Sequence, residues 1–228
     1  MNPFMMLAAV AADWTRLGPL LDPGAHRTLR ALLADVRTRL RAYDEGNPGD
    51  RVAAGRSAAD QAVRAVLDAL PVGEAARLRG DGGTDRFAGT SPSAVHEGYD
   101  AMDLCMLVID GNPMVGPLLG PVRERLLQAP ASSPRETGPT DPRLIVLTRE
   151  HGEKQLPDFQ FEAGTMPWAV VLEVADVLCA NQDPWGVADW WLSTNAWTGT
   201  APADLLGQGR DLELLGAARA LTVADGEW

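Results

Sequence analysis

Over residues 156–206 the chain reads LPDFQFEAGTMPWAVVLEVADVLCANQDPWGVADWWLSTNAWTGTAPADLL, and this stretch holds five of the seven tryptophans. The pattern predicts the second arm of a β-hairpin, an amphipathic helix, a tryptophan-rich helix starting at Asp183-Pro184, and a short helix after Ala201-Pro202. Such a concentration of aromatic residues indicates either a dense small core or a surface that grips another protein.

The composition places the chain among globular proteins with one large or two small domains in its 228 residues. We expect no membrane span because no run of eighteen apolar residues occurs. The opening MNPFMMLAAVAADW predicts an amphipathic helix rather than a signal peptide, since Asp13 and Arg16 follow closely. We therefore expect a cytoplasmic protein.

The acidic charge is concentrated near the C-terminus. Residues 150–228 contain thirteen acidic side chains against three basic ones, whereas the preceding 149 residues are close to neutral. The negative electrostatic field of this region disfavours binding to nucleic acid and favours association with a basic partner. Simple solubility explains the acidic composition equally well.

The remainder of the chain predicts helices separated by loops. Apolar periodicity favours helices over 23–43, 58–70, 97–109 and within 115–127. Residues 129–142 contain four prolines and few apolar groups, which is typical of a linker. The sequence therefore predicts a helical domain over 1–128, a linker over 129–142 and a second domain over 143–228.

The second domain is predicted to open with a β-hairpin. Residues 144–148 read as one strand, 150–153 as the turn and 155–161 as the second arm, with Pro157 favouring an edge position for that arm. A last helix is predicted around residues 212–221. The expected fold class is therefore mainly α, with one β-hairpin in the smaller C-terminal domain.

Candidate catalytic and metal-binding groups are sparse. His151 falls in the predicted turn, where a solvated histidine is expected, and residues 80–83 (GDGG) lack the strand and the Lys-Ser/Thr of a phosphate loop. The three histidines and two cysteines have no ligand spacing, so we expect no metal site and no cofactor. We do not expect an enzyme.

An arginine stripe offers a nucleic-acid alternative. Arg27, Arg30, Arg37 and Arg41 recur at helical spacing and could follow phosphates. A solvated outer face is the favoured interpretation because Asp35 and nearby acidic residues dilute the charge. A helix-turn-helix over 99–127 is rejected, since its second helix begins with apolar residues and contains two Gly-Pro pairs.

The tryptophans are the strongest candidates for protein binding. Trp190 and Trp191 are adjacent, so on a helix they point about 100° apart, and one can pack inward while the other leans to a flank. Trp185 and Trp197 accompany them. A fully buried tryptophan core remains the competing interpretation.

These residues carry a family resemblance. Residues 143–222 resemble the toxin-binding domain of Xre/MbcA/ParS-type antitoxins in the order, spacing and type of their motif residues. Pro157, Phe159, Gln160 and Phe161 match the family pattern PxFQF. The tryptophan helix, its exit and the closing unit match through the following residues: Trp185, Trp190, Leu192, Asn195, Gly199, Pro202, Leu205, Leu206 and Gly209.

The resemblance implies a partner and a mode of action. Domains of this family bind a toxin with a RES fold that consumes NAD, and they block access to its cofactor pocket with the closing helix and tail, which here correspond to residues 212–228. The N-terminal 140 residues depart from the family because we find no DNA-binding helix-turn-helix there, which puts autoregulation in doubt.

The sequence thus predicts a bacterial antitoxin-like protein. The expected partner-binding residues are Phe159, Phe161, Trp185, Trp190, Trp191, Asn195, Leu205, Leu206, Arg210, Arg219 and Trp228. Two alternatives stay open: a DNA-binding regulator that uses the arginine stripe, and a scaffold or assembly protein that self-associates through its C-terminal domain. The oligomeric state is left open.

Overall fold

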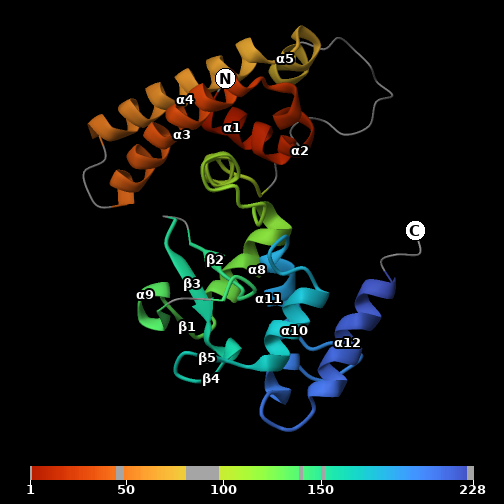
Figure 1. Cartoon of the computed structure of the whole chain (residues 1–228). Helices are drawn as coiled ribbons and strands as arrows, with labels where there is room; N and C mark the ends of the chain where they lie inside the picture. Colours follow the sequence, from red (N-terminus) through yellow and green to blue (C-terminus); the bar gives the residue numbers. More distant parts are fainter. Residues whose placement is uncertain (1, 45–48, 81–97, 139–140, 150–151, 225–228) are drawn as a thin grey trace. The chain divides into compact units, whose positions relative to one another are not determined.

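The computed structural model describes residues 2–44, 49–80, 98–138, 141–149 and 152–224. The described chain is mainly helical with a few short antiparallel strands, which confirms the predicted fold class. It divides into two compact units, residues 1–120 and 121–228 (Figure 1). None of the described helices is both long and apolar enough to cross a membrane.

Unit 1 is built on a pair of long helices. Helices α3 (Pro23–Asp44) and α4 (Gly49–Ala69) run side by side, and α1 (Pro3–Ala12) packs against α4 (Figure 1). The other elements are α2 (Trp14–Leu17), the 3-10 turn η1 (Gly18–Leu20), α5 (Val72–Arg79), α7 (Ala101–Cys105) and the π-helical turn η2 (Met106–Asp110). The apolar stripe predicted for α3 is the face that joins the core.

The predicted helix start at Asp22 is present in detail. Its Oδ1 accepts hydrogen bonds from the backbone N–H groups of Gly24 (2.6 Å) and Ala25 (2.9 Å). These bonds satisfy donors that the first turn of a helix leaves free, and they lower the pKa of the Asp22 carboxyl. Leu29, Leu33 and Val36 are then buried at helical spacing.

Unit 2 contains two small sheets. In the first, β3 (Lys154–Pro157) lies between β1 (Ala131–Ser132) and β2 (Leu147–Thr148), and both pairings are antiparallel. In the second, β4 (Phe161–Ala163) pairs with β5 (Met166–Pro167) after the 3-10 turn η3 (Asp158–Gln160). The predicted hairpin is the β2–β3 pair, and its first strand is shorter than predicted.

The prediction that Pro157 places its strand at an edge is wrong. Strand β1 covers that side of β3, with Ala131 opposite Pro157. The proline is tolerated because it is the last residue of β3, and the ladder continues through the Asp158 N–H, which donates to the Pro130 carbonyl (2.8 Å).

The predicted linker therefore has structure that its composition does not suggest. It supplies β1 and the short helix α9 (Pro134–Thr137), which Pro134 opens and which the Glu136 carboxylate caps through the Ser133 N–H (2.6 Å). The chain divides between residues 120 and 121, inside helix α8 (Gly116–Gln128), rather than within 129–142. Composition misses this structure because proline and serine, which break long helices and strands, also occur at the first positions of short ones.

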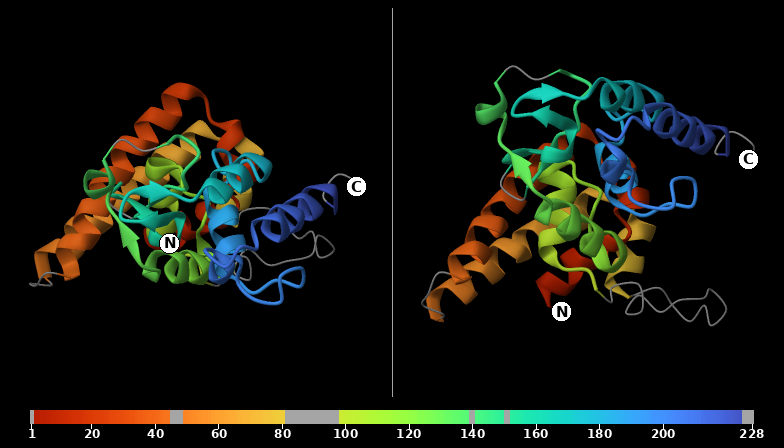
Figure 2. Two further views of the ribbon diagram at one scale, coloured as in Figure 1. Left: turned by 60° about the horizontal axis from the view of Figure 1, so that its bottom comes forward. Right: turned by 90° about the horizontal axis from the view of Figure 1, so that it is seen from below.

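The remaining helices of unit 2 follow in the predicted order. They are α10 (Ala169–Val177), α11 (Pro184–Leu192), the 3-10 turn η4 (Pro202–Leu205) and α12 (Asp211–Ala224). Helix α12 packs along α10, and η4 contacts both α11 and α12 (Figure 2). The loop over residues 193–200 joins α11 to the segment before η4, and only part of it is exposed, including Ala196 and Trp197.

Candidate protein-binding site

The tryptophan-rich helix α11 turns most of its aromatic surface inward. Its first turn is capped by Asp183, whose Oδ1 accepts from the Gly186 N–H (2.9 Å). Trp185 is 6% exposed and Trp191 is 0% exposed, whereas Trp190 is half-buried and meets the Trp191 ring edge-on with centroids 5.0 Å apart. The two adjacent indoles therefore diverge as helix geometry requires.

Several predicted partner-binding residues belong to the core of unit 2. Phe159 packs on Trp191 at a centroid distance of 5.4 Å, and Leu205 is buried. An enclosed side chain cannot meet a partner directly, so Trp185, Trp191 and Leu205 are corrected from surface residues to supporting ones.

The other predicted residues vary in exposure. Phe161, Asn195, Leu206 and Arg210 are half-buried, Arg219 is exposed, and Trp228 lies outside the described residues. Arg210, which precedes α12, is held by that helix because its Nε donates to Glu213 Oε2 (2.7 Å).

Gln160, the glutamine of the PxFQF pattern, has a structural role that sequence reasoning missed. It is completely buried, and its Oε1 accepts from the Ile145 N–H (2.7 Å) while its Nε2 donates to the carbonyls of Ile145 (3.0 Å) and Pro157 (3.2 Å). One side-chain amide thus replaces a strand partner for Ile145, which explains why β2 begins only at Leu147.

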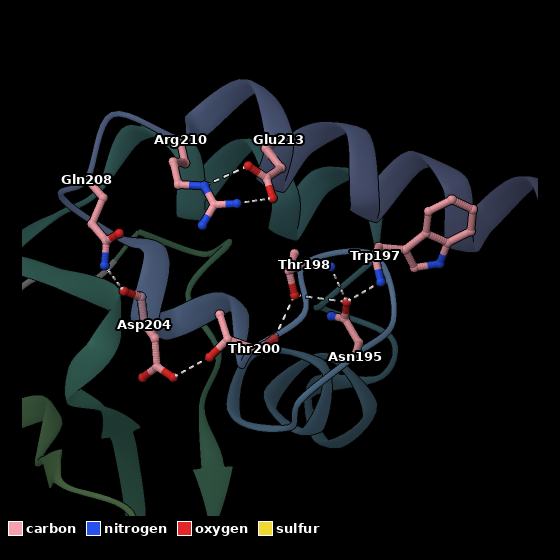
Figure 3. Close-up of polar contacts among 8 residues, drawn as sticks. All are labelled: Asn195, Trp197, Thr198, Thr200, Asp204, Gln208, Arg210 and Glu213. Atoms are coloured by element: carbon pink, nitrogen blue, oxygen red, sulfur yellow. Dashed lines mark hydrogen bonds and ion pairs between the residues drawn. The ribbon is translucent and has the colours of Figure 1, made fainter.

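The loop over residues 193–200 is organised around Asn195. Its Oδ1 accepts from the backbone N–H groups of Trp197 (3.0 Å) and Thr198 (3.0 Å), and its carbonyl accepts from the Gly199 N–H (2.9 Å) (Figure 3). The Thr198 hydroxyl lies 2.9 Å from Asn195 Oδ1 and 2.6 Å from the Thr200 carbonyl oxygen. An asparagine that accepts from the second and third following N–H groups forms an Asx-turn, which fixes the loop without regular structure.

Both ends of this loop are also anchored. At its start, Arg125 forms an ion pair with Asp189 and donates to Ser193 Oγ (3.1 Å), and Ser193 Oγ donates to Asp189 (2.9 Å). At its end, Thr200 Oγ1 donates to Asp204 Oδ2 (3.0 Å) (Figure 3). The loop is therefore anchored by hydrogen bonds at both ends and around Asn195.

Trp197 projects from the centre of this anchored loop. Its side chain is 64% exposed, whereas the described tryptophans of α11 are buried or half-buried. Nearby in sequence, Leu212 on α12 is 87% exposed. The sequence pattern Asn-x-Trp-Thr, in which Asn195 precedes Trp197 by two residues, is the signal that could have identified Trp197 as the displayed indole.

The arginine stripe of α3 is less available for nucleic acid than its spacing predicts. Arg37 pairs with Asp110 (2.8 Å), and Arg39 on the same helix pairs with Asp35 (2.8 Å). Arg27 and Arg30 are exposed, and the Arg41 side chain lies outside the described part. An arginine that already pairs with a carboxylate releases fewer counterions from a phosphate backbone than an unpaired arginine does, so it contributes less to nucleic-acid binding.

Candidate chemistry is limited elsewhere. Among the described residues no group of three His, Cys, Asp or Glu side chains could hold a metal ion. His151 and residues 81–83 lie outside the described ranges. Of the two free thiols, Cys105 is buried and Cys179 is exposed.

Comparison with known proteins yields no relative. No family model, no curated protein and no solved structure matches the chain. The resemblance of residues 143–222 to antitoxins therefore rests on the motif residues alone.

Proposed function

We propose that unit 2 is an antitoxin-like module that binds a RES-fold, NAD-consuming toxin and covers its cofactor pocket. The observation that carries the proposal is Trp197, an indole 64% exposed at the tip of a loop that Asn195 fixes. The toxin class comes from the sequence resemblance, and the location of the contact comes from the loop.

A fixed, exposed indole has the properties of an interface anchor. Tryptophan is enriched among the residues that dominate binding energy, and an anchor that is already ordered loses little conformational entropy when it binds. The hydrogen bonds that Asn195 Oδ1 accepts from the Trp197 and Thr198 N–H groups, and the ion pair of Arg125 with Asp189, anchor the loop backbone without a partner.

The charge of unit 2 favours a basic partner. Residues 121–228 hold sixteen acidic and eight basic side chains, which account for most of the net charge of −11. A pocket that receives a pyrophosphate is expected to be basic, so its rim would attract this unit electrostatically. Helix α12, with Leu212 exposed near its start, would then lie over the entrance.

The test is co-expression with the neighbouring reading frame, if that frame encodes a RES-type protein. The intact chain should co-purify with that protein and restore growth and cellular NAD. Trp197→Ala should weaken the complex by about 30-fold, the loss expected for an anchor worth ~2 kcal/mol. Met166→Ala, which truncates another exposed apolar side chain of unit 2, is the control and should change affinity less than about threefold.

Two results would contradict the proposal separately. Failure to bind any RES-type neighbour would remove the toxin assignment, and binding unaffected by Trp197→Ala would remove the contact site. The alternatives have their own readouts: a steep salt dependence of duplex DNA binding supports a regulator, and a stable homo-oligomer that Trp190→Ala dissociates supports a scaffold.

A further inference from the structure

Unit 2 has a polar cleft away from the tryptophan loop in sequence. It encloses about 530 Å³ and is lined by Ser133, Pro134, Arg135, Glu153 and Lys154. It lies next to the last printed pair of the antiparallel β1–β3 ladder, Ser132 with Leu156, where one chain continues into α9 and the other comes from Lys154 at the start of β3. The start of α9 and the start of β3 thereby form the two walls.

The cleft brings together two of the three cations that the described part of unit 2 leaves unpaired, the third being the exposed Arg219 on α12. Arg125, Arg143 and Arg210 each pair with a carboxylate, and Arg149 donates to Gln155. By contrast, the exposed side chains of Arg135 and Lys154 have no hydrogen bond or ion pair with any described residue. Two free cations at one cleft are notable because the unit around them is strongly acidic.

The remaining lining groups add selectivity. Glu153 contributes an exposed carboxylate, whereas the Ser133 hydroxyl is engaged by the Glu136 carboxylate. The neighbouring Glu136 carboxylate is engaged by the Ser133 N–H, which lowers its pKa and keeps it on its own helix cap. The cleft thus presents two cations and one acceptor carboxylate, a set that suits a polar ligand within the usual size range of small-molecule sites.

We propose that this cleft binds a small phosphomonoester that also carries hydroxyl groups. The phosphate lies between Arg135 and Lys154, because a dianion with three terminal oxygens can accept from cations on two different chain segments at once. A ligand hydroxyl donates to Glu153, whose carboxylate would otherwise repel the phosphate. This site is independent of the toxin-binding proposal.

Lys154 makes the site directly measurable, because it is the only lysine in the chain. An amine-acylating reagent can therefore modify one side chain and the N-terminal amine, and mass spectrometry separates the two. Ribose 5-phosphate should slow acylation of Lys154 in the full chain while the N-terminal amine reacts unchanged. Inorganic phosphate should protect more weakly, and ribose alone should not protect.

Variants assign the contacts. Arg135→Ala should raise the ribose 5-phosphate concentration needed for half-protection by about tenfold, the loss expected for a charge-assisted hydrogen bond. Glu153→Gln should reduce the advantage of ribose 5-phosphate over inorganic phosphate. Arg56→Ala, which removes an exposed cation from α4 of unit 1, is the matched control and should change nothing.

Several results would reject the phosphomonoester site. No protection by ribose 5-phosphate, equal protection in the Arg135→Ala variant, or equal protection by the dicarboxylate succinate would each reject a phosphomonoester site. Protection by adenosine 5′-monophosphate that exceeds ribose 5-phosphate would identify a nucleotide as the ligand, and equal protection would identify a sugar phosphate. Toxin binding measured on the same variants should be unaffected, so the two proposals fail separately.

Discussion

Gln160 is the residue for which the role inferred from the sequence motif differs most from the role seen in the structure. As part of PxFQF it supported a partner-binding strand, yet its amide is fully buried and satisfies both backbone groups of Ile145. No periodicity reveals this, because a glutamine between two phenylalanines is ordinarily assigned to the solvent face of a strand. For Trp197, by contrast, local sequence is informative, because its exposure accompanies an Asx-turn that a sequence pattern can indicate.

Gln160→Leu should destabilise unit 2 by about 3 kcal/mol. The substitution leaves the N–H and C=O of Ile145 buried without their partner, and each unsatisfied buried group costs about 1–3 kcal/mol. Urea unfolding followed by tryptophan fluorescence measures the change. Gln182→Leu, at an exposed turn position, is the control, and equal stability of the two variants would show that the buried amide is dispensable.

Asp141 should titrate well below an ordinary aspartate. The Arg143 side chain and backbone N–H donate to its carboxylate and lower its pKa from 3.8 to about 2. Because the folded pKa is depressed, the stability that this pair adds is present above pH 3.8 and is lost as the pH falls toward 2. A carboxyl carbon NMR titration measures it, and a pKa near 4 would mean that the pair does not form in solution.

At the level of elements, apolar periodicity predicted α3 closely, but it missed the first nine residues of α4, which begins at Gly49, and it missed the short helix α5. Helix α3 and its cap at Asp22 follow from local sequence, as do Asp183-Pro184 and the start of α11. Strand β1 could not be predicted, since two residues carry no periodicity and their pairing depends on β3, more than twenty residues away. The π-helical turn η2 and the sharp start of α8 likewise depend on tertiary packing.

The junction before α8 depends on a glycine. Gly116 has φ +75°, and a Cβ at this position would overlap the Tyr99 ring. Gly116→Ala should therefore destabilise unit 1 by about 2 kcal/mol or more, from backbone strain and steric overlap together.

Thermal unfolding measures this effect against a close control. Gly120→Ala lies on the same helix, has nothing within 4 Å of the added Cβ, and should be neutral or stabilising by about 0.5–1 kcal/mol. If both substitutions had the same effect, the Tyr99 contact would not constrain the junction.

At the scale of the whole molecule, composition predicted two domains with a linker over 129–142, whereas the two compact units divide between residues 120 and 121. The segment over 129–142 looks like a linker, yet its β1 and α9 complete unit 2, and Leu126 of α8 is fully buried. Composition reports how many apolar groups a segment has, whereas the fold depends on where the few that exist are buried.

Fragments should distinguish the two boundaries. A fragment over 113–228 retains α8 and β1 and should unfold cooperatively in urea with a well-defined midpoint. A fragment over 143–228, the domain predicted from sequence, lacks Leu126 and one neighbour of β3, so it should be unfolded or aggregated. Cooperative unfolding of the shorter fragment would restore the sequence-based boundary.

The position of the single lysine has a consequence for local opening of unit 2. A protease that cleaves only after lysine has one target peptide bond, between Lys154 and Gln155, and that bond lies in the central strand of the first sheet. Cleavage requires an extended, unpaired backbone, so β1 and β2 must separate from β3 first. The rate of one proteolytic nick therefore reports the opening free energy of this sheet in the unmodified chain, without any label or substitution.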